Sequence, residues 1–198
     1  MTFHIRPFRS SDLPDLYRIC LLTGDSGQDA SSLYKDPHLL GHFYAAPYAV
    51  LEPELAFVLE DDAGNCGYII GALNSHAFEK RMNGEWLPPL RERYKVPLES
   101  DRSPDAGMIR AIHQGYHAGV EAGFYPAHLH IDLLERAQGQ GQGKRLMHTL
   151  WAKLRALEVP GVHLGVNKRN TGGVAFYKKL GFEQLEDYGT WLSYGIRL

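Results

Sequence analysis

The sequence has few cysteines, no long apolar run and little net charge, so it lacks the features of disulfide-rich, membrane-spanning or strongly charged proteins. Cys20 and Cys66 are its only cysteines, too few for a disulfide framework and in keeping with a reducing cytoplasm. No apolar run is long enough to span a membrane, and the start, MTFHIRPFRSSDL, lacks the long apolar core of a signal peptide. The net charge of −2 gives no electrostatic case for nucleic acid or an anionic membrane. These absences predict a cytoplasmic protein with neither kind of partner.

The composition suits a soluble globular chain of one domain. Its 198 residues are 44% hydrophobic and 22% charged, and no internal repeat is visible. Residues 75–127 differ from the rest, because they are rich in Arg, Glu, Pro, His and aromatic residues but contain too little aliphatic side chain for an independent core. We therefore expect one domain over residues 1–198 that carries a helical insertion at 75–127.

Hydrophobic periodicity predicts strands and helices in alternation, which indicates an α/β protein. The predicted strands cover 3–8, the two arms of a hairpin within 55–74, and 127–134, 162–167, 182–188 and 190–198. The first predicted helix begins after a cap at Ser10 or Ser11, and the second covers 36–46 and ends at Pro47. Three short helices are predicted in the insertion, over 77–82, 87–94 and 105–117. A further helix carries the stripe Leu146, Met147, Leu150, Trp151, Leu154 and Leu157, and a last one covers 171–180 before Gly181.

The stretch QGQGQGKRL, from Gln138 to Leu146, places a glycine-rich loop between a predicted strand and a predicted helix. The start of a helix presents unpaired amide groups to an anion, and glycines let the backbone approach it closely. The mononucleotide P-loop pattern fails, because Gln138 stands where its first Gly belongs and Arg145 where Ser or Thr belongs. The dinucleotide pattern fails at Lys144. An anion site and a plain tight turn both remain open.

Two blocks together resemble the GNAT family of N-acetyltransferases. QGQGQG matches the family's pyrophosphate-loop pattern Q/R-x-x-G-x-G/A, and NKRNTGGVAFYKKLGF matches its later block. Asn170, Tyr177, Gly181 and Phe182 fall at the expected places, whereas Gly173 stands where the family more often has Ala. The resemblance implies a central, twisted, mixed sheet of seven strands flanked by helices, with the insertion between the third and fourth strands. It also implies acetyl-CoA as co-substrate, held in a splay between the fourth and fifth strands.

A narrower resemblance covers most of the chain, including the insertion. The segments YRIC, FVLEDDAGNCGYIIGAL, FEKRMNGEWLPPLRERY, HIDLL and AFYKKLGF are similar to the C-terminal acetyltransferase-like domain of the animal O-GlcNAcase family. In that domain the glycine loop is degraded and acetyltransferase activity is in doubt, but here the loop is kept. The resemblance therefore implies a stand-alone bacterial relative that still binds acetyl-CoA.

The GNAT resemblance also implies a set of cofactor contacts. Amides of the loop would surround the pyrophosphate, and the strand before the loop would hold the acetyl and pantetheine groups. Other interpretations stay open for single residues: a solvated helix lysine for Lys144, plain core for Leu133 and Leu134, and a helix N-cap for Asn170. The expected cofactor-binding residues are Leu133, Leu134, Gln138, Gly139, Gln140, Gly141, Gln142, Gly143, Lys144, Asn170, Phe176 and Tyr177.

Tyr177 resembles the family's general acid, which would protonate the departing thiolate, and its alternative is a packed aromatic side chain. Asp132, on the strand beside the expected acetyl site, is the candidate base, because a protonated alkylamine cannot attack until it loses a proton. Its alternative is a structural cap. His128, His130 and Asp132 alternate along that strand, but no cluster of Cys or His supports them, and we expect no metal. The same holds for His113 and His117.

The predicted reaction is direct acetyl transfer from acetyl-CoA to a primary amine, on a small molecule or a protein lysine, in a ternary complex. A non-catalytic acetyl-CoA-binding or protein-interaction module is the rival, and a different acyl donor such as succinyl-CoA is a second alternative. We expect Trp86 and Tyr94, in the insertion, to bind the acceptor with help from neighbouring charges; a helical lid over the sheet edge is the other interpretation. A monomer and a homodimer are both compatible with the sequence.

Overall fold

The computed structural model describes residues 2–198, and at its centre is a seven-stranded mixed sheet. The strand order is β1-β2-β3-β4-β5-β7-β6. The strands are β1 (His4–Pro7), β2 (Ala56–Asp61), β3 (Gly64–Ala72), β4 (Ala127–Leu133), β5 (Gly161–Asn167), β6 (Glu183–Asp187) and β7 (Trp191–Arg197). This confirms the expected sheet, including the predicted hairpin, which is β2–β3.

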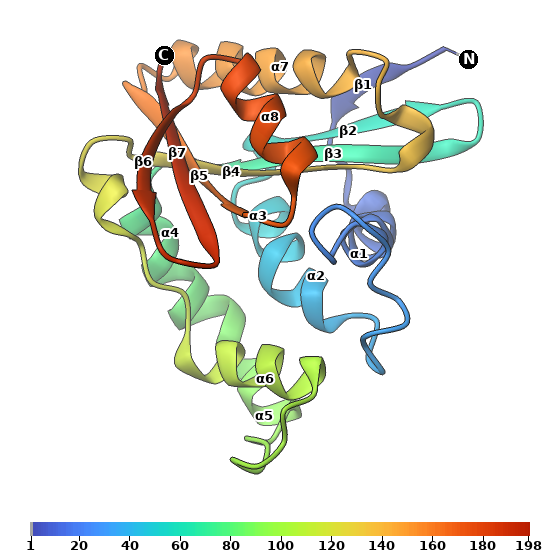
Figure 1. Ribbon diagram of the computed structural model, residues 1–198, viewed down its shortest axis with the longest axis vertical. Helices are drawn as coiled ribbons and strands as arrows, with labels where there is room; N and C mark the ends of the chain where they lie inside the picture. Colours follow the sequence, from blue (N-terminus) through green and yellow to red (C-terminus); the bar gives the residue numbers. More distant parts are fainter. Residues whose placement is uncertain (1) are drawn as a thin grey trace.

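Helices cover both faces of the sheet. Figure 1 shows α7 and α8 above the strands and the other helices below them. The helices are α1 (Leu13–Leu22), α2 (Leu39–Tyr44), α3 (Ala46–Leu51), α4 (Ser75–Arg81), α5 (Leu87–Arg93), α6 (Pro104–Gln114), α7 (Gln142–Ala156) and α8 (Thr171–Lys179). A π-helical segment, Met82–Trp86, joins α4 to α5, and short 3₁₀ turns cover Ser10–Asp12, Pro53–Leu55, Val120–Gly123 and Glu135–Ala137. Among the helices of residues 2–198, none combines the length and apolar character needed to cross a bilayer.

The strand β4 and the helix α7 follow their sequence patterns closely. On β4, Leu133 faces α7, where its side chain approaches the position of Gly143, and the alternate residues face the opposite side. On α7, the stripe from Leu146 to Leu154 is buried, as the 3.6-residue period predicts. The prediction was wrong at Leu157, which lies just past the last turn of α7, as its C-cap, and is exposed.

Two local predictions in the first helical region were also wrong. Pro47 does not close one helix over 36–46; it lies in the first turn of α3, where its missing N–H costs no hydrogen bond. Neither Ser10 nor Ser11 caps α1, because both lie in a 3₁₀ turn and Asp12 is the N-cap residue. The Asp12 carboxylate instead accepts two hydrogen bonds from the Arg6 guanidinium, at 2.6 and 2.8 Å.

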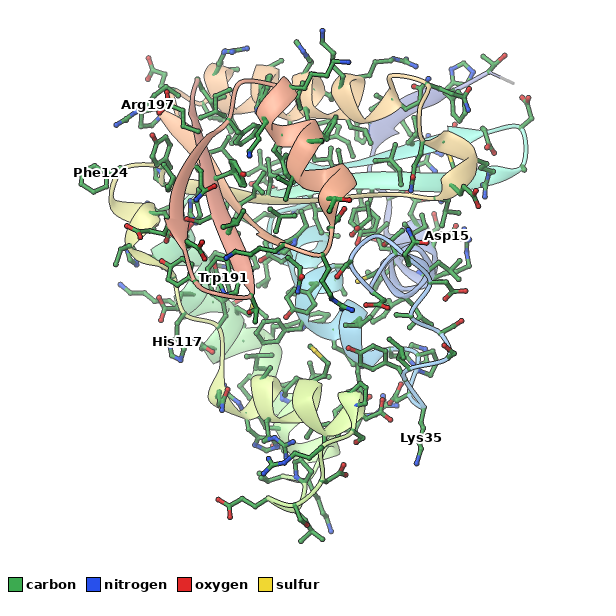
Figure 2. All side chains as sticks on the ribbon, viewed as in Figure 1. Asp15, Lys35, His117, Phe124, Trp191 and Arg197 are labelled. Carbon is green, nitrogen blue, oxygen red and sulfur yellow. The ribbon has the colours of Figure 1, made fainter. Side chains whose placement is uncertain are left out.

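The segment between β3 and β4 is helical, as expected, and packs against α2. Its buried side chains Phe78, Met82, Leu87 and Ile112 belong to the same apolar cluster as the sheet. This segment forms the lower part of the molecule in Figure 1. Figure 2 shows His117, which follows α6, at the left side of the molecule, and Lys35, on the connection between α1 and α2, projecting outward at the right side.

The sheet is interrupted at one place. The parallel pair β4–β5 is joined only through Ala127 with Val162 and His128 with His163, after which the two strands separate. Every other neighbouring pair is antiparallel and has a longer ladder. The expected splay between the fourth and fifth strands is therefore present.

Candidate functional site

The gap between β4 and β5 continues into a cleft of about 790 Å³. Both faces of the sheet contribute to its walls, so the cleft passes beside β4 from the α7–α8 side to the α1 side. Its lining residues come from β4 (Ile131, Asp132, Leu133), the end of α1 and the loop after it (Thr23, Asp25–Gln28), the glycine loop and first turn of α7 (Ala137–Gly139, Gly141–Lys144), and the start and inner side of α8 (Arg169–Gly173, Phe176, Tyr177, Lys179, Leu180).

The glycine loop presents free backbone amides to this cleft. The first backbone hydrogen bond of α7 runs from the Arg145 amide to the Gly141 carbonyl, at 3.1 Å. Within residues 2–198, none of the amides from Gly139 to Lys144 has a backbone or side-chain acceptor. Amides left unpaired at a helix N-terminus, where the helix dipole is positive, form a site for an anion.

The three glycines serve two different purposes. Gly139 and Gly141 have φ values of 71° and 75°, in the left-handed region that disfavours other residues, and no atom lies within 4 Å of a Cβ placed there. Gly143 has an ordinary φ, but a Cβ there would lie 3.1 Å from the Phe176 ring. The first two shape the loop, and the third lets α7 approach α8.

The glutamines of the loop act differently from the sequence expectation. The Gln138 side-chain amide donates to the Leu133 carbonyl at 2.8 Å, and that of Gln140 donates to the Arg136 carbonyl at 2.8 Å. Gln140 does not line the cleft. Its side chain is used to hold the loop, so only its backbone amide is left for a cofactor contact.

The strand β4 offers the cleft only alternate backbone groups. The Leu134 amide donates to the carbonyl of Cys66 in β3, at 2.8 Å, and the Leu134 side chain is buried. Since N–H groups alternate in direction along a strand, those of Ile131 and Leu133 point toward the separated β5. Leu133 lines the cleft and Leu134 does not, so of the two expected contacts the geometry favours Leu133.

Asn170 caps α8 and contacts the loop that follows α1. Its side-chain oxygen accepts a hydrogen bond from the Gly173 amide at 2.8 Å, as the N-cap interpretation predicts. A Cβ at Gly173 would lie 2.9 Å from this side chain, which explains the glycine where the family more often has Ala. Gly27, with φ of 91°, would bring a Cβ to 3.4 Å from the same side chain. Asn170 also lines the cleft, so a cofactor contact remains open to it.

Charges surround the cleft mouth. The Arg169 guanidinium donates to the Asp25 carboxylate at 2.6 Å, which ties the loop after α1 to the start of α8. Lys144 and Lys179 also line the cleft, and neither is in an ion pair within residues 2–198. Two cations are thus available to phosphate groups.

The two candidate catalytic side chains share the cleft. Tyr177 is buried, and burial, with the nearby Asp132 carboxylate, raises its pKa well above the ordinary value, so the phenol is neutral. Burial also raises the pKa of Asp132, while a hydrogen bond from the Tyr68 hydroxyl opposes this. A carboxylate with a raised pKa is a stronger base than an exposed one, and a neutral phenol is a proton donor.

Trp86 and Tyr94, the expected acceptor contacts, lie outside the cleft. The Trp86 indole N–H donates to the His42 carbonyl at 2.8 Å, and the Tyr94 hydroxyl donates to the Asp36 carboxylate at 2.7 Å. Neither side chain lines the cleft; both pack partly buried against the core. Their position fits the interpretation in which the insertion covers other parts of the molecule.

His128 and His130 take part in a buried hydrogen-bond network and not in a metal cluster. His128 contacts the Ser75 hydroxyl through Nδ1 at 2.7 Å and the Tyr48 hydroxyl through Nε2 at 3.0 Å, and His130 contacts Tyr48 at 3.1 Å. Burial lowers the pKa of both imidazoles, that of His130 to about 4, so both are neutral at pH 7. No group of three or more His, Cys, Asp or Glu side chains in the described part of the chain is arranged to hold a metal ion.

Sequence reasoning missed the loop after α1. Asp25–Gln28 and Arg169 line the cleft, but the segment has no periodicity and no motif that relates it to a site elsewhere in the chain. The available signals were Gly24, Gly27 and the two basic residues before Asn170, and none of them indicates which other segment of the chain it contacts.

Known proteins resemble this chain in sequence and in structure. A model described as the acetyltransferase (GNAT) domain matches residues 100–184. O-GlcNAcase from Rattus norvegicus is 26% identical over 182 residues, which is 90% of this chain and 20% of that protein. The chain therefore spans only about a fifth of the length of this curated relative.

Solved structures extend the comparison. The crystal structure of SsHAT superposes with a TM-score of 0.93 at 38% identity, covering 100% of this chain and 98% of that one. The PaiA N-acetyltransferase from Thermoplasma acidophilum, solved in complex with coenzyme A, has a TM-score of 0.57 at 14% identity, with 100% of both chains covered, and shows the fold alone. With its sheet, its splay and its glycine loop, the chain belongs to the GNAT acetyltransferase family.

Proposed function

We propose that this protein is an acetyl-CoA-dependent N-acetyltransferase that transfers the acetyl group directly to a primary amine in a ternary complex. One observation carries the proposal: the unpaired amides of residues 139–144 open into the same cleft as Asp132 and Tyr177. An anion site and a base–acid pair in one cleft are what acetyl transfer from a phosphorylated thioester requires.

The residues present suit acetyl-CoA. Amides from Gly139 to Lys144 would hold the pyrophosphate, and Lys144 and Lys179 would add positive charge. The outward amide of Leu133 would bind the pantetheine arm or the thioester carbonyl, where a donor stabilises the developing oxyanion. A cleft of about 790 Å³ is in the usual range for a ligand of this kind.

Asp132 and Tyr177 would handle the two protons of the reaction. Asp132 takes a proton from the acceptor nitrogen as the new C–N bond forms. The C–S bond then breaks, and the Tyr177 hydroxyl donates a hydrogen bond and then its proton to the departing thiolate. Burial keeps the Tyr177 phenol protonated until the thiolate departs, and it makes the Asp132 carboxylate more basic.

A panel of amines tests the proposal against the rival binding module. Small amines, polyamines, amino acids and lysine peptides are each incubated with acetyl-CoA, and free thiol and acetylated product are measured together. We expect equal amounts of thiol and amide with at least one acceptor, and loss of both with Asp132→Asn. Tight acetyl-CoA binding without amide formation from any acceptor would favour the non-catalytic module. The same panel with succinyl-CoA tests the choice of acyl donor.

A further inference from the structure

Tyr68 lies directly opposite Asp132 across the β3–β4 ladder. The register pairs the two residues, so their side chains share the face of the sheet that points toward α1. Tyr68 is fully buried, and its hydroxyl donates to Oδ2 of Asp132. A buried phenol that uses its only proton on one carboxylate oxygen fixes the orientation of that carboxylate.

The other oxygen of Asp132 is left open. Tyr68 makes the one close hydrogen bond to this carboxylate within residues 2–198; the Thr23 hydroxyl, which donates to the Ile19 carbonyl at 2.8 Å, lies near it and also lowers the pKa of Asp132, and Oδ1 is not among the enclosed polar atoms without a partner. Asp132 itself lines the cleft. The carboxylate therefore has one oxygen held from inside the sheet and one free to meet a proton in the cleft.

Within the described part of the chain, no cation forms an ion pair with this carboxylate. Cys20 and Thr23 face it from the end of α1, Tyr177 faces it from α8, and the neighbour on its own strand face, His130, is neutral. The Arg169 guanidinium in the same cleft is paired with Asp25. Since burial favours the protonated acid, the hydrogen bond from Tyr68 is the principal contact that favours the ionised base.

We infer that Tyr68 is the positioning residue of the acetyl-transfer base: it holds the Asp132 carboxylate with Oδ2 occupied and Oδ1 directed to the acceptor amine. This inference rests on the proposed function, because it assigns Tyr68 a part in the reaction through Asp132. Tyr68 itself does not line the cleft and touches no reacting atom.

Tyr68→Phe tests the inference, because it removes the hydroxyl and keeps the ring in the core. The side-chain carboxyl carbon of Asp132 is followed by ¹³C NMR through a pH titration, with its signal assigned from Asp132→Asn. Loss of a hydrogen bond to a charged group corresponds to a rise of about 1 pH unit or more in the titration midpoint. Tyr194→Phe is the matched control, since the Tyr194 hydroxyl is buried without a partner, and we expect no rise there.

An unchanged Asp132 midpoint in folded Tyr68→Phe would overturn the inference, and so would an equal rise in Tyr194→Phe. If Tyr68→Phe does not fold, the Tyr68 hydroxyl proton is observed in the wild-type protein labelled at tyrosine Cζ. A downfield signal that disappears or moves upfield in Asp132→Asn supports the inference, and a signal that Asp132→Asn leaves unmoved overturns it.

Activity provides the second arm and separates this inference from the proposed function. With an identified acceptor, the acidic limb of the plot of kcat/KM against pH should shift to higher pH in Tyr68→Phe, while the affinity for acetyl-CoA stays the same. A limb that does not move would contradict the inference. Failure of every acceptor would overturn the proposed function, yet the NMR comparison would still report whether Tyr68 controls Asp132.

Discussion

Comparing Gly141→Asp with Gly141→Asn isolates the effect of a negative charge on the binding of an anion at the glycine loop. Gly141 is the N-cap of α7, has φ of 75° and is exposed, and no atom lies within 4 Å of a Cβ placed there. Asn and Asp are nearly equal in size and are the non-glycine residues that best tolerate positive φ. Both variants should therefore fold alike, and only Gly141→Asp places a negative charge beside the pyrophosphate.

The magnitude follows from the electrostatics of a partly exposed site. Two unit charges about 4 Å apart repel by about 1 kcal/mol in water and about 4 kcal/mol at an effective dielectric constant of 20. For an exposed residue we take about 2 kcal/mol, which is an increase of about 30-fold in the Kd for acetyl-CoA relative to Gly141→Asn. The difference should shrink as salt rises toward 1 M, because the Debye length falls to about 3 Å.

Isothermal titration calorimetry of acetyl-CoA into both variants measures this difference. Gly64→Asp is the control, because Gly64 also has positive φ and open space around it but is the first residue of β3, next to the β2–β3 turn, and the Kd of this variant should equal that of the wild type. Equal Kd values for Gly141→Asp and Gly141→Asn at low salt would refute the reasoning. Equal values for Gly141→Asp and the wild type would remove the loop from the site.

Three other perturbations test separate parts of the account. Tyr177→Phe should keep the acetyl-CoA Kd and lower kcat by about 10²- to 10⁴-fold, as expected for a lost general acid, and an unchanged kcat would end that assignment. Trp86→Ala should cost about 3 kcal/mol in urea unfolding, through lost packing and the lost bond to the His42 carbonyl, with the acceptor KM unchanged; a raised KM without a stability loss would return Trp86 to the acceptor site. The pKa of Asp12, lowered from 3.8 to about 2 beside Arg6, implies about 2 kcal/mol of stability that is present above pH 4 and lost as pH falls toward 2. In Asp12→Asn this acid-dependent loss should be absent from unfolding curves, and an identical acid dependence would contradict the pairing.

The sequence was sufficient where local pattern and structure share a physical cause. The stripe on α7 and the alternation on β4 are properties of one element each, so periodicity predicted their buried faces. The glycine loop was recognisable because left-handed backbone at Gly139 and Gly141 requires glycine. The sequence alone did not distinguish Leu133 from Leu134, because the difference depends on which of the two amides donates to β3.

Other parts of the site depend on contacts between distant segments. Arg169 meets Asp25 across the cleft mouth, and Tyr68 meets Asp132 across a ladder, although these residues are far apart in the chain. Aromatic side chains in the insertion suggested recognition, yet Trp86 uses its indole to hold α2. An exposed binding aromatic residue and a partly buried packing one have the same appearance in a sequence.

An amide NMR titration with acetyl-CoA tests the central claim most directly, since the claim is that the free amides of the glycine loop hold this co-substrate. In ¹⁵N-labelled protein, the account predicts the largest shifts at residues 139–144, in the β4 segment 131–133 and at the start of α8. ADP has the pyrophosphate but lacks the pantetheine arm. It should therefore shift the amide resonances of the loop and leave the amide resonances of residues 131–133 unchanged. Unchanged loop amides at saturating acetyl-CoA, or shifts confined to another part of the molecule, would contradict the account.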